Sequence, residues 1–261
     1  MLTSTSAVSR AGLDAVALKP TECDVSLATE LPVDTLAIDY EGREHLPGSE
    51  TLESLAADKT VLVTTPVRAD GFDPLGDTSA LESFPPEVGR VLVAGHPAYL
   101  TDAERKRAVA PRLGLALESR PDAWVGTESI ERIAMATGAT QYDLLSRGTD
   151  RELRALRRAG FDGDIAVYAP TVMTDDEDAI LDAVGAYVSR RRPVENALPE
   201  GAATDSSATG RAREVLLAAA DDYALIGTAD EVRERTEALR KAGATTVVSY
   251  PARGLETILE T

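Results

Sequence analysis

Short runs of apolar and β-branched residues alternate along the chain with longer, charged segments, a pattern typical of strands and helices in turn. The predicted strands span residues 14–18, 35–39, 60–65, 90–94, 113–118, 142–146, 164–168 and 245–250. The predicted helices span residues 22–30, 50–57, 79–83, 102–109, 129–137, 150–158, 176–191, 211–222 and 255–259, with another between Thr228 and Gly243.

Several of the predicted helices carry their own start and stop signals. Thr149 with Glu152, and Thr228 with Glu231, have the spacing of a capping box at a helix N-terminus. Gly138, Gly160 and Gly243 each stand where a helix gives way to a strand, a position that favours a left-handed residue. The repetition supports a recurring β/α unit.

Eight strands alternating with helices predict a single (β/α)8 TIM-type barrel over residues 1–261. A doubly wound open sheet is the alternative, but no Gly-x-Gly-x-x-Gly fingerprint follows a strand. Residues 193–210 are small and polar without periodicity, which predicts a flexible insertion loop before the eighth strand. The loop is interpreted either as a plain surface insertion or as a lid over the site.

The charge of the chain limits its partners and its environment. The net charge is −17, and only four of the 27 basic residues are lysines. We interpret this as an acidic, hydrated surface, adapted to high salt as in halophilic proteins. Nucleic acid and anionic membranes are not expected as partners, because both repel such a surface. One cysteine allows no intramolecular disulfide, and without a long apolar stretch the chain is expected to be cytoplasmic.

Candidate site residues lie at the ends of the predicted strands, because barrel sites form at the C-terminal ends of the strands. The candidate catalytic residues are His96, which follows a Val-rich strand and could donate a proton, and Glu118. His96 could also be a loop residue that packs beside Pro97. The candidate cofactor-binding residues are Asp39, Thr64, Ser146, Arg147, Tyr168, Ser249 and Arg253. Arg253 opens the last helix, where a phosphate is favoured.

Other kinds of site have less support in the sequence. Two distant histidines and one cysteine do not make a metal site. Neither a Gly-x-Ser-x-Gly elbow nor a phosphate-binding Gly-Lys-Ser/Thr loop is present. Glu41 and Glu118, both expected at strand ends, leave open a pair of carboxylates for glycoside hydrolysis.

Two stretches of the C-terminal part carry a resemblance to a known family. The first is Asp164-Ile-Ala-Val-Tyr-Ala-Pro170, followed by acidic residues that open a helix. The second is Gly227-Thr228-x-Asp-Glu231-Val232, then a helix, Ala242-Gly243 and a Val-rich strand. In order and spacing, roughly over residues 160–251, they resemble the luciferase-like superfamily of bacterial luciferase and deazaflavin-dependent reductases.

The resemblance implies a barrel with an insertion before its last strand and an oxidoreductase that binds FMN or a deazaflavin coenzyme at the strand ends. The chain is short for that family, its N-terminal half matches poorly, and few aromatic residues are expected near the strand ends. We therefore keep a second hypothesis, a degenerate barrel that has lost catalysis and serves as a binding or assembly protein. A carbohydrate or sugar-phosphate enzyme is a third. A small-molecule cofactor or substrate is the expected partner, and homo-oligomer formation is left open.

Overall fold

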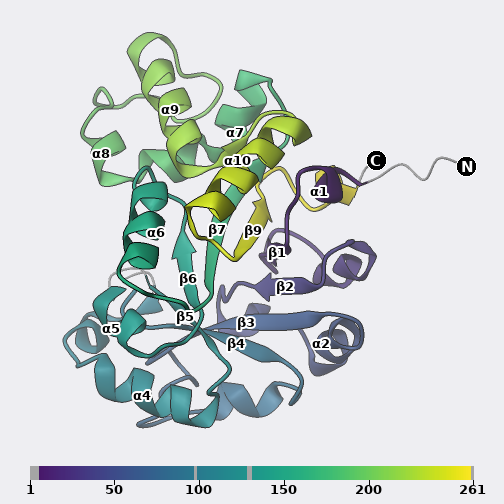
Figure 1. Ribbon diagram of the computed structural model, residues 1–261, viewed down its shortest axis with the longest axis vertical. Helices are drawn as coiled ribbons and strands as arrows, with labels where there is room; N and C mark the ends of the chain where they lie inside the picture. Colours follow the sequence, from purple (N-terminus) through teal and green to yellow (C-terminus); the bar gives the residue numbers. More distant parts are fainter. Residues whose placement is uncertain (1–5, 97–98, 128–130, 260–261) are drawn as a thin grey trace, which may run out of the picture.

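The computed structural model describes residues 6–96, 99–127 and 131–259, and its centre is a closed barrel of parallel strands (Figure 1). Its strands, in order around the barrel, are β1 (Ala15–Leu18), β2 (Thr35–Ile38), β3 (Thr60–Pro66), β4 (Gly89–Val93), β5 (Trp124–Gly126), β6 (Gln141–Leu144), β7 (Ile165–Val172) and β9 (Thr246–Pro251). β9 pairs with β1 and β7, and β6 pairs with β7, so the sheet has no open edge. The predicted (β/α)8 barrel is confirmed and the open sheet is excluded.

Helices connect the strands and surround the barrel. The α-helices are α1 (Ala7–Arg10), α2 (Ser49–Ala56), α3 (Asp102–Arg105), α4 (Ala110–Ser119), α5 (Glu131–Ala136), α6 (Thr149–Arg158), α7 (Glu177–Ser189), α8 (Arg192–Glu195), α9 (Gly210–Tyr223), α10 (Ala229–Ala242) and α11 (Glu256–Leu259). Three short 3-10 helices are η1 (Val25–Glu30), η2 (Arg43–His45) and η3 (Ser79–Ser83). The capping box at Thr228 forms as predicted. The expected start of helix 129–137 falls partly on residues outside the described ones.

The barrel core follows from the alternation of side chains along each strand. Residues of one parity, such as Val16 and Leu36, face the helices and belong to the main apolar cluster. Residues of the other parity fill the interior, where Ala15, Ala17 and Ala37 face the much larger Tyr142, Tyr168 and Leu62. Small side chains on β1 and β2 therefore leave room for tyrosines from β6 and β7.

The strand predicted at residues 113–118 is wrong, because this segment is the second half of α4. A short apolar run does not by itself distinguish a strand from a buried helix face. Pro111 lies in the first turn of α4, where its fixed φ suits a helix, and Leu113 and Ala116 form the buried face. The fifth barrel strand is instead β5, which begins at Trp124.

The predicted insertion before the eighth barrel strand is confirmed. It carries α7, α8, α9, a short strand β8 (Leu225–Ile226) and α10; β8 pairs with the end of β7, outside the barrel. In Figure 1, α7, α8 and α9 gather at one end of the molecule. Within residues 193–210, Val194 and Ala208 are buried against α7 and α9, and the Ser206 N–H donates to Asp182 Oδ1 at 2.9 Å. The flexibility of this stretch stays a prediction.

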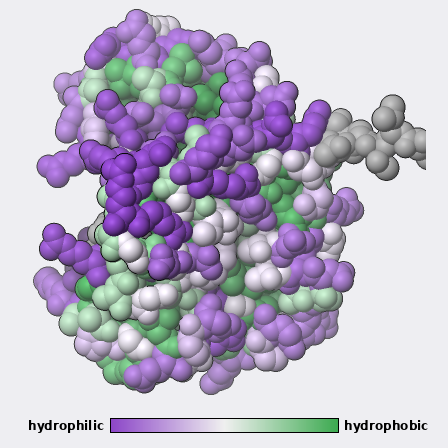
Figure 2. All heavy atoms as spheres, viewed as in Figure 1, coloured by the Kyte–Doolittle hydropathy of each residue, from purple (hydrophilic) through white to green (hydrophobic). Residues whose placement is uncertain are grey.

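The visible surface is largely polar. Figure 2 shows hydrophilic residues spread across the face that carries α6 and α10, with apolar patches between them. Exposed large apolar side chains among the described residues include Leu115 on α4 and Met135 on α5. None of the described helices is both long enough and apolar enough to cross a membrane.

Candidate active site

A chamber of about 220 Å³ lies in the barrel at the C-terminal ends of its strands. Its walls continue the interior parity of the core, two residues beyond a core side chain on each strand. Lys19, just after β1, lies two residues beyond Ala17, and Asp39, just after β2, lies two residues beyond Ala37. The wall residues of the other strands follow the same spacing. The wall residues at this level are Lys19, Asp39, Thr64, Val93, Gly126, Leu144 and Tyr168. The chamber is therefore the topmost layer of the barrel interior, the position where barrel enzymes form their sites.

Four of the predicted site residues line this chamber. They are Asp39, Thr64, His96 and Tyr168. Thr64 is fixed because its Oγ1 accepts the N–H of Tyr40 at 2.6 Å. The structure thus brings together four side chains from four different strands, as expected from their shared place at strand ends.

Glu118 does not belong to this site. It lies in the last turn of α4, in the helical layer, because the segment that was expected to end in a strand is a helix. The prediction that Glu118 closes a barrel strand is wrong. The proposed carboxylate pair of Glu41 and Glu118 loses its geometric basis, and with it the glycosidase alternative.

Ser146 and Arg147 follow β6 at the C-terminal end of the barrel, in the turn that starts α6. The Ser146 hydroxyl lies 3.2 Å from the Thr149 hydroxyl and accepts the Gly148 N–H at 3.2 Å. The Arg147 side chain is 81% exposed, with Nε 3.9 Å from Asp222 Oδ2. Neither residue lines the chamber.

Ser249 and Arg253 also lie outside the chamber wall. Ser249 has the opposite parity to Val248 and Tyr250, so its buried side chain points toward the helical layer. Arg253 is exposed in the turn after β9, at the same end of the barrel as His96. Arg253 could therefore meet only a part of a ligand that extends out of the chamber.

Asp39 is an ionisable group of the chamber whose pKa is shifted toward neutral pH. Burial raises the pKa of its carboxyl from 3.8 to about 7. Lys19 opposes this shift, while Glu41 and Glu22 add to it. Lys19 is shared, because its Nζ also lies 3.2 Å from Glu22 Oε1 and 4.0 Å from the centroid of the Tyr250 ring. A carboxyl with such a pKa can hold or release a proton near neutral pH.

An aromatic wall runs through the barrel interior beside Asp39. The rings of Trp124, Tyr142, Tyr168 and Tyr250 follow one another with centroids 6.0, 5.9 and 6.1 Å apart, and the last two are stacked at 9°. The buried Tyr142 hydroxyl has no hydrogen-bond partner among the described residues. Burial and the charge of Asp39 raise the pKa of both Tyr142 and Tyr168, so these hydroxyls remain donors.

Several residues of the chamber were not predicted from the sequence. Tyr99 follows β4, Tyr142 lies on β6, and Tyr187 and Arg190 come from the C-terminal end of α7. The expectation that few aromatic residues lie near the strand ends is wrong, since four of the seven tyrosines line the chamber. Tyr142 lies two residues before Leu144 on β6, so both side chains face the barrel interior, and the sequence could have shown this. The position of α7 depends instead on tertiary packing.

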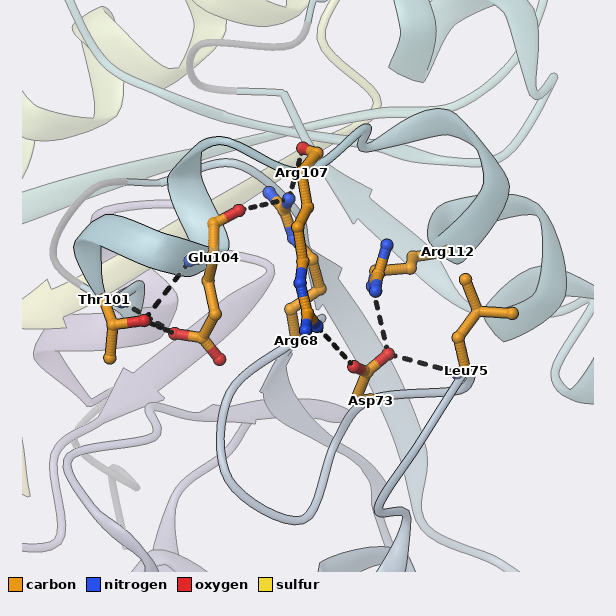
Figure 3. A network of polar contacts seen from close by, with 7 residues as sticks. All are labelled: Arg68, Asp73, Leu75, Thr101, Glu104, Arg107 and Arg112. Carbon is orange, nitrogen blue, oxygen red and sulfur yellow. Dashed lines mark hydrogen bonds and ion pairs between the residues drawn. The ribbon is translucent and has the colours of Figure 1, made fainter.

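A polar network joins the segment of residues 101–112 to the loop that follows β3 (Figure 3). Arg68, which follows β3, is 2% exposed and has a left-handed φ of 85°. Its Nη1 donates to the carbonyls of Glu104 and Arg107 at the end of α3. Asp73 accepts from Arg107 and Arg112 in the same network. The loops after β3 and β4 are therefore joined to each other by hydrogen bonds.

Within the described residues, no group of three or more His, Cys, Asp or Glu side chains has the arrangement of a metal site. The polar groups on the chamber wall are one carboxyl, one imidazole, one amine, one guanidinium, one hydroxyl and four phenols.

Comparison with known proteins gives a family and a fold. The model of a family of unknown function (DUF7388) matches residues 8–258. A solved F420-dependent secondary alcohol dehydrogenase, in complex with an F420-acetone adduct, superposes with a TM-score of 0.57 at 12% identity, covering 92% of this chain and 93% of the other. At that identity the likeness shows the shared barrel fold. A search of curated sequences found no match.

Proposed function

The chain belongs to the family of unknown function DUF7388, and we propose that it is an oxidoreductase that uses a deazaflavin or flavin coenzyme, with the coenzyme ring in the chamber. The observation that carries the proposal is Asp39, a carboxyl with a pKa of about 7 that faces a tyrosine-lined chamber at the C-terminal end of the barrel. The shared fold with a coenzyme-dependent dehydrogenase, and the resemblance of residues 160–251 to the luciferase-like superfamily, support it.

The chamber suits one part of such a coenzyme. Its volume of about 220 Å³ lies below the roughly 300 Å³ at which ligand pockets usually begin, so only the ring end would enter. Aromatic walls suit a flat ring, and the unpaired Tyr142 hydroxyl offers a donor to a ring acceptor. A phosphate-bearing tail would lie outside the chamber. Arg190, on the chamber wall, and Arg253, exposed at the same end of the barrel, are the arginines proposed to meet it.

The coenzyme, when bound, supplies the hydride chemistry, and the protein supplies position and proton transfer. Asp39 is the group suited to take a proton from a substrate hydroxyl, or to return one to a carbonyl, because its pKa lies near neutral pH. His96 is a second donor at the chamber wall. Tyr168 and Leu144 exclude water from one side, which strengthens polar interactions inside.

A barrel that binds a small ligand without catalysis is the second candidate, and the small volume of the chamber favours it. The two candidates differ in what they require. An oxidoreductase needs a coenzyme and an acid-base group, whereas a binding protein needs only the walls.

The test is a pair of measurements on protein purified without added coenzyme. FMN and a deazaflavin coenzyme are each added during thermal unfolding, and one of them is expected to raise the melting temperature. A ligand of the folded state at a hundred times its Kd adds about 2.7 kcal/mol. Asp39→Asn should keep coenzyme binding and lose turnover with a secondary alcohol or its ketone. Wild-type protein that responds to neither coenzyme would leave the binding-protein candidate in place.

A further inference from the structure

A second cavity, of about 280 Å³, lies on the outer face of β3 and β4. On β4, Val91 and Val93 face the barrel interior, so Arg90 and Leu92 point outward into the helical layer. Helix α4 covers the cavity on one side and the segment from Phe72 to Leu81 on the other. We call this space the Arg90 cavity. The sheet separates it from the chamber, because Thr64 lines the chamber and its neighbour Thr65 lines the Arg90 cavity.

Arg90 brings a positive charge to the wall of this cavity. Its Nε is buried and has no hydrogen-bond partner, and no carboxylate of the described residues lies within 4 Å of its guanidinium. Asp122, whose charge acts on Arg90, has its Oδ1 3.4 Å from Nε of Arg120. Burial lowers the pKa of the Arg90 guanidinium and the neighbouring Arg120 lowers it further, while the charge of Asp122 opposes the shift. Arginine nevertheless stays charged.

The rest of the wall is mainly apolar. Phe72, Leu81, Leu92, Leu115 and Ala116 supply most of its surface. Leu115 is 36% exposed at the surface of α4, so the cavity opens to solvent beside it. A strongly hydrated inorganic anion would lose its water against these side chains without compensation. An anion with an apolar body would bury that body and pair with the arginine at once.

We propose that the Arg90 cavity is a binding site for a small monocarboxylate with an apolar body, in which Arg90 donates to both carboxylate oxygens. The planar guanidinium presents paired N–H donors in the geometry that a carboxylate accepts. The ligand supplies the acceptor that Nε lacks in the protein itself. This site is independent of the coenzyme proposed for the chamber.

Benzoate is the probe, and benzamide, with the same shape and no charge, is its control. Isothermal titration calorimetry on the full chain should detect benzoate and not benzamide. Arg90→Gln should weaken benzoate binding by about tenfold to a hundredfold, the loss expected when hydrogen bonds to a charged group are removed. Ala116→Leu, which adds bulk inside the cavity and keeps Arg90 in the sequence, should also abolish binding. Arg120→Gln is the matched control, because Arg120 already pairs with Asp122, and it should retain binding.

Three results would overturn the proposal. They are equal binding of benzoate and benzamide, unchanged benzoate binding by Arg90→Gln, and no heat from either benzoate or hexanoate. Folding of the variant is checked separately by thermal unfolding without ligand. Since Nε of Arg90 has no hydrogen-bond partner in the protein, Arg90→Gln should not lower the melting temperature, and a large fall would show that Arg90 is a structural residue instead.

Discussion

Replacing Asp39 by asparagine isolates the effect of its carboxyl on the stability of the fold. The folded-state pKa is raised from 3.8 to about 7, so between these values the folded protein holds a proton that the unfolded chain has released. The unfolded state then binds fewer protons, and the free energy of unfolding must fall as pH rises through this window. The amide of the Asp39→Asn variant has no proton to lose in this range, so the variant lacks this contribution.

The size of the effect follows from the two pKa values. Each pH unit between them is worth about 1.4 kcal/mol, so the wild type should lose up to about 4 kcal/mol relative to the variant between about pH 4 and pH 7. Above that range the difference should level off. All other carboxyls are shared by both proteins and largely cancel in the comparison.

The assay is urea denaturation of both proteins across this pH range, with linear extrapolation to water. Asp58→Asn, which removes one exposed carboxylate, is the control for the change in net charge. A difference that stays the same at every pH would refute the reasoning. A difference that grows toward acid pH would show that pairing with Lys19 outweighs burial and lowers the pKa of Asp39.

Three further predictions concern the whole fold. The melting temperature should rise with added potassium chloride, because a net charge of −17 repels itself over about 30 Å at 0.01 M salt and about 3 Å at 1 M; a flat or falling profile contradicts this. Limited proteolysis should cut first within residues 193–210, and first cuts within residues 60–120 would count against it. Arg68→Ala should lower the free energy of unfolding in urea by about 2 kcal/mol, since two carbonyls lose a charged donor, whereas Lys106→Ala, exposed in the segment that carries those carbonyls, should change it little.

Most of the barrel could be predicted because each strand carries its own local signal. A β-branched run followed by a capped helix and a glycine specifies one β/α unit, and repetition of the unit specifies closure. The failure at residues 113–118 has a local cause as well. Leu113 and Ala116 satisfy a helix face as readily as a strand, and the true strand at Trp124–Gly126 has only three residues, too few to show a period.

The site was predictable only to the extent that strand ends define it. Asp39, Thr64, His96 and Tyr168 could be placed at one end of the barrel from the sequence, but a strand end does not tell which way a side chain faces. Ser249 shows this, because side chains alternate along a strand, and Ser249, between Val248 and Tyr250, points away from the chamber. The contribution of α7 depends on how the insertion packs over the barrel, and no local pattern encodes that.

The most direct test of the central claim is a fluorescence titration of the coenzyme with wild-type protein and with Leu144→Trp. Leu144 lies on the chamber wall, so the larger side chain should fill the space proposed for the ring while leaving the exposed Arg253 untouched. Our account predicts saturable binding of the deazaflavin coenzyme or FMN by the wild type and its loss in the variant. Equal binding by both proteins, or binding by neither, would contradict it.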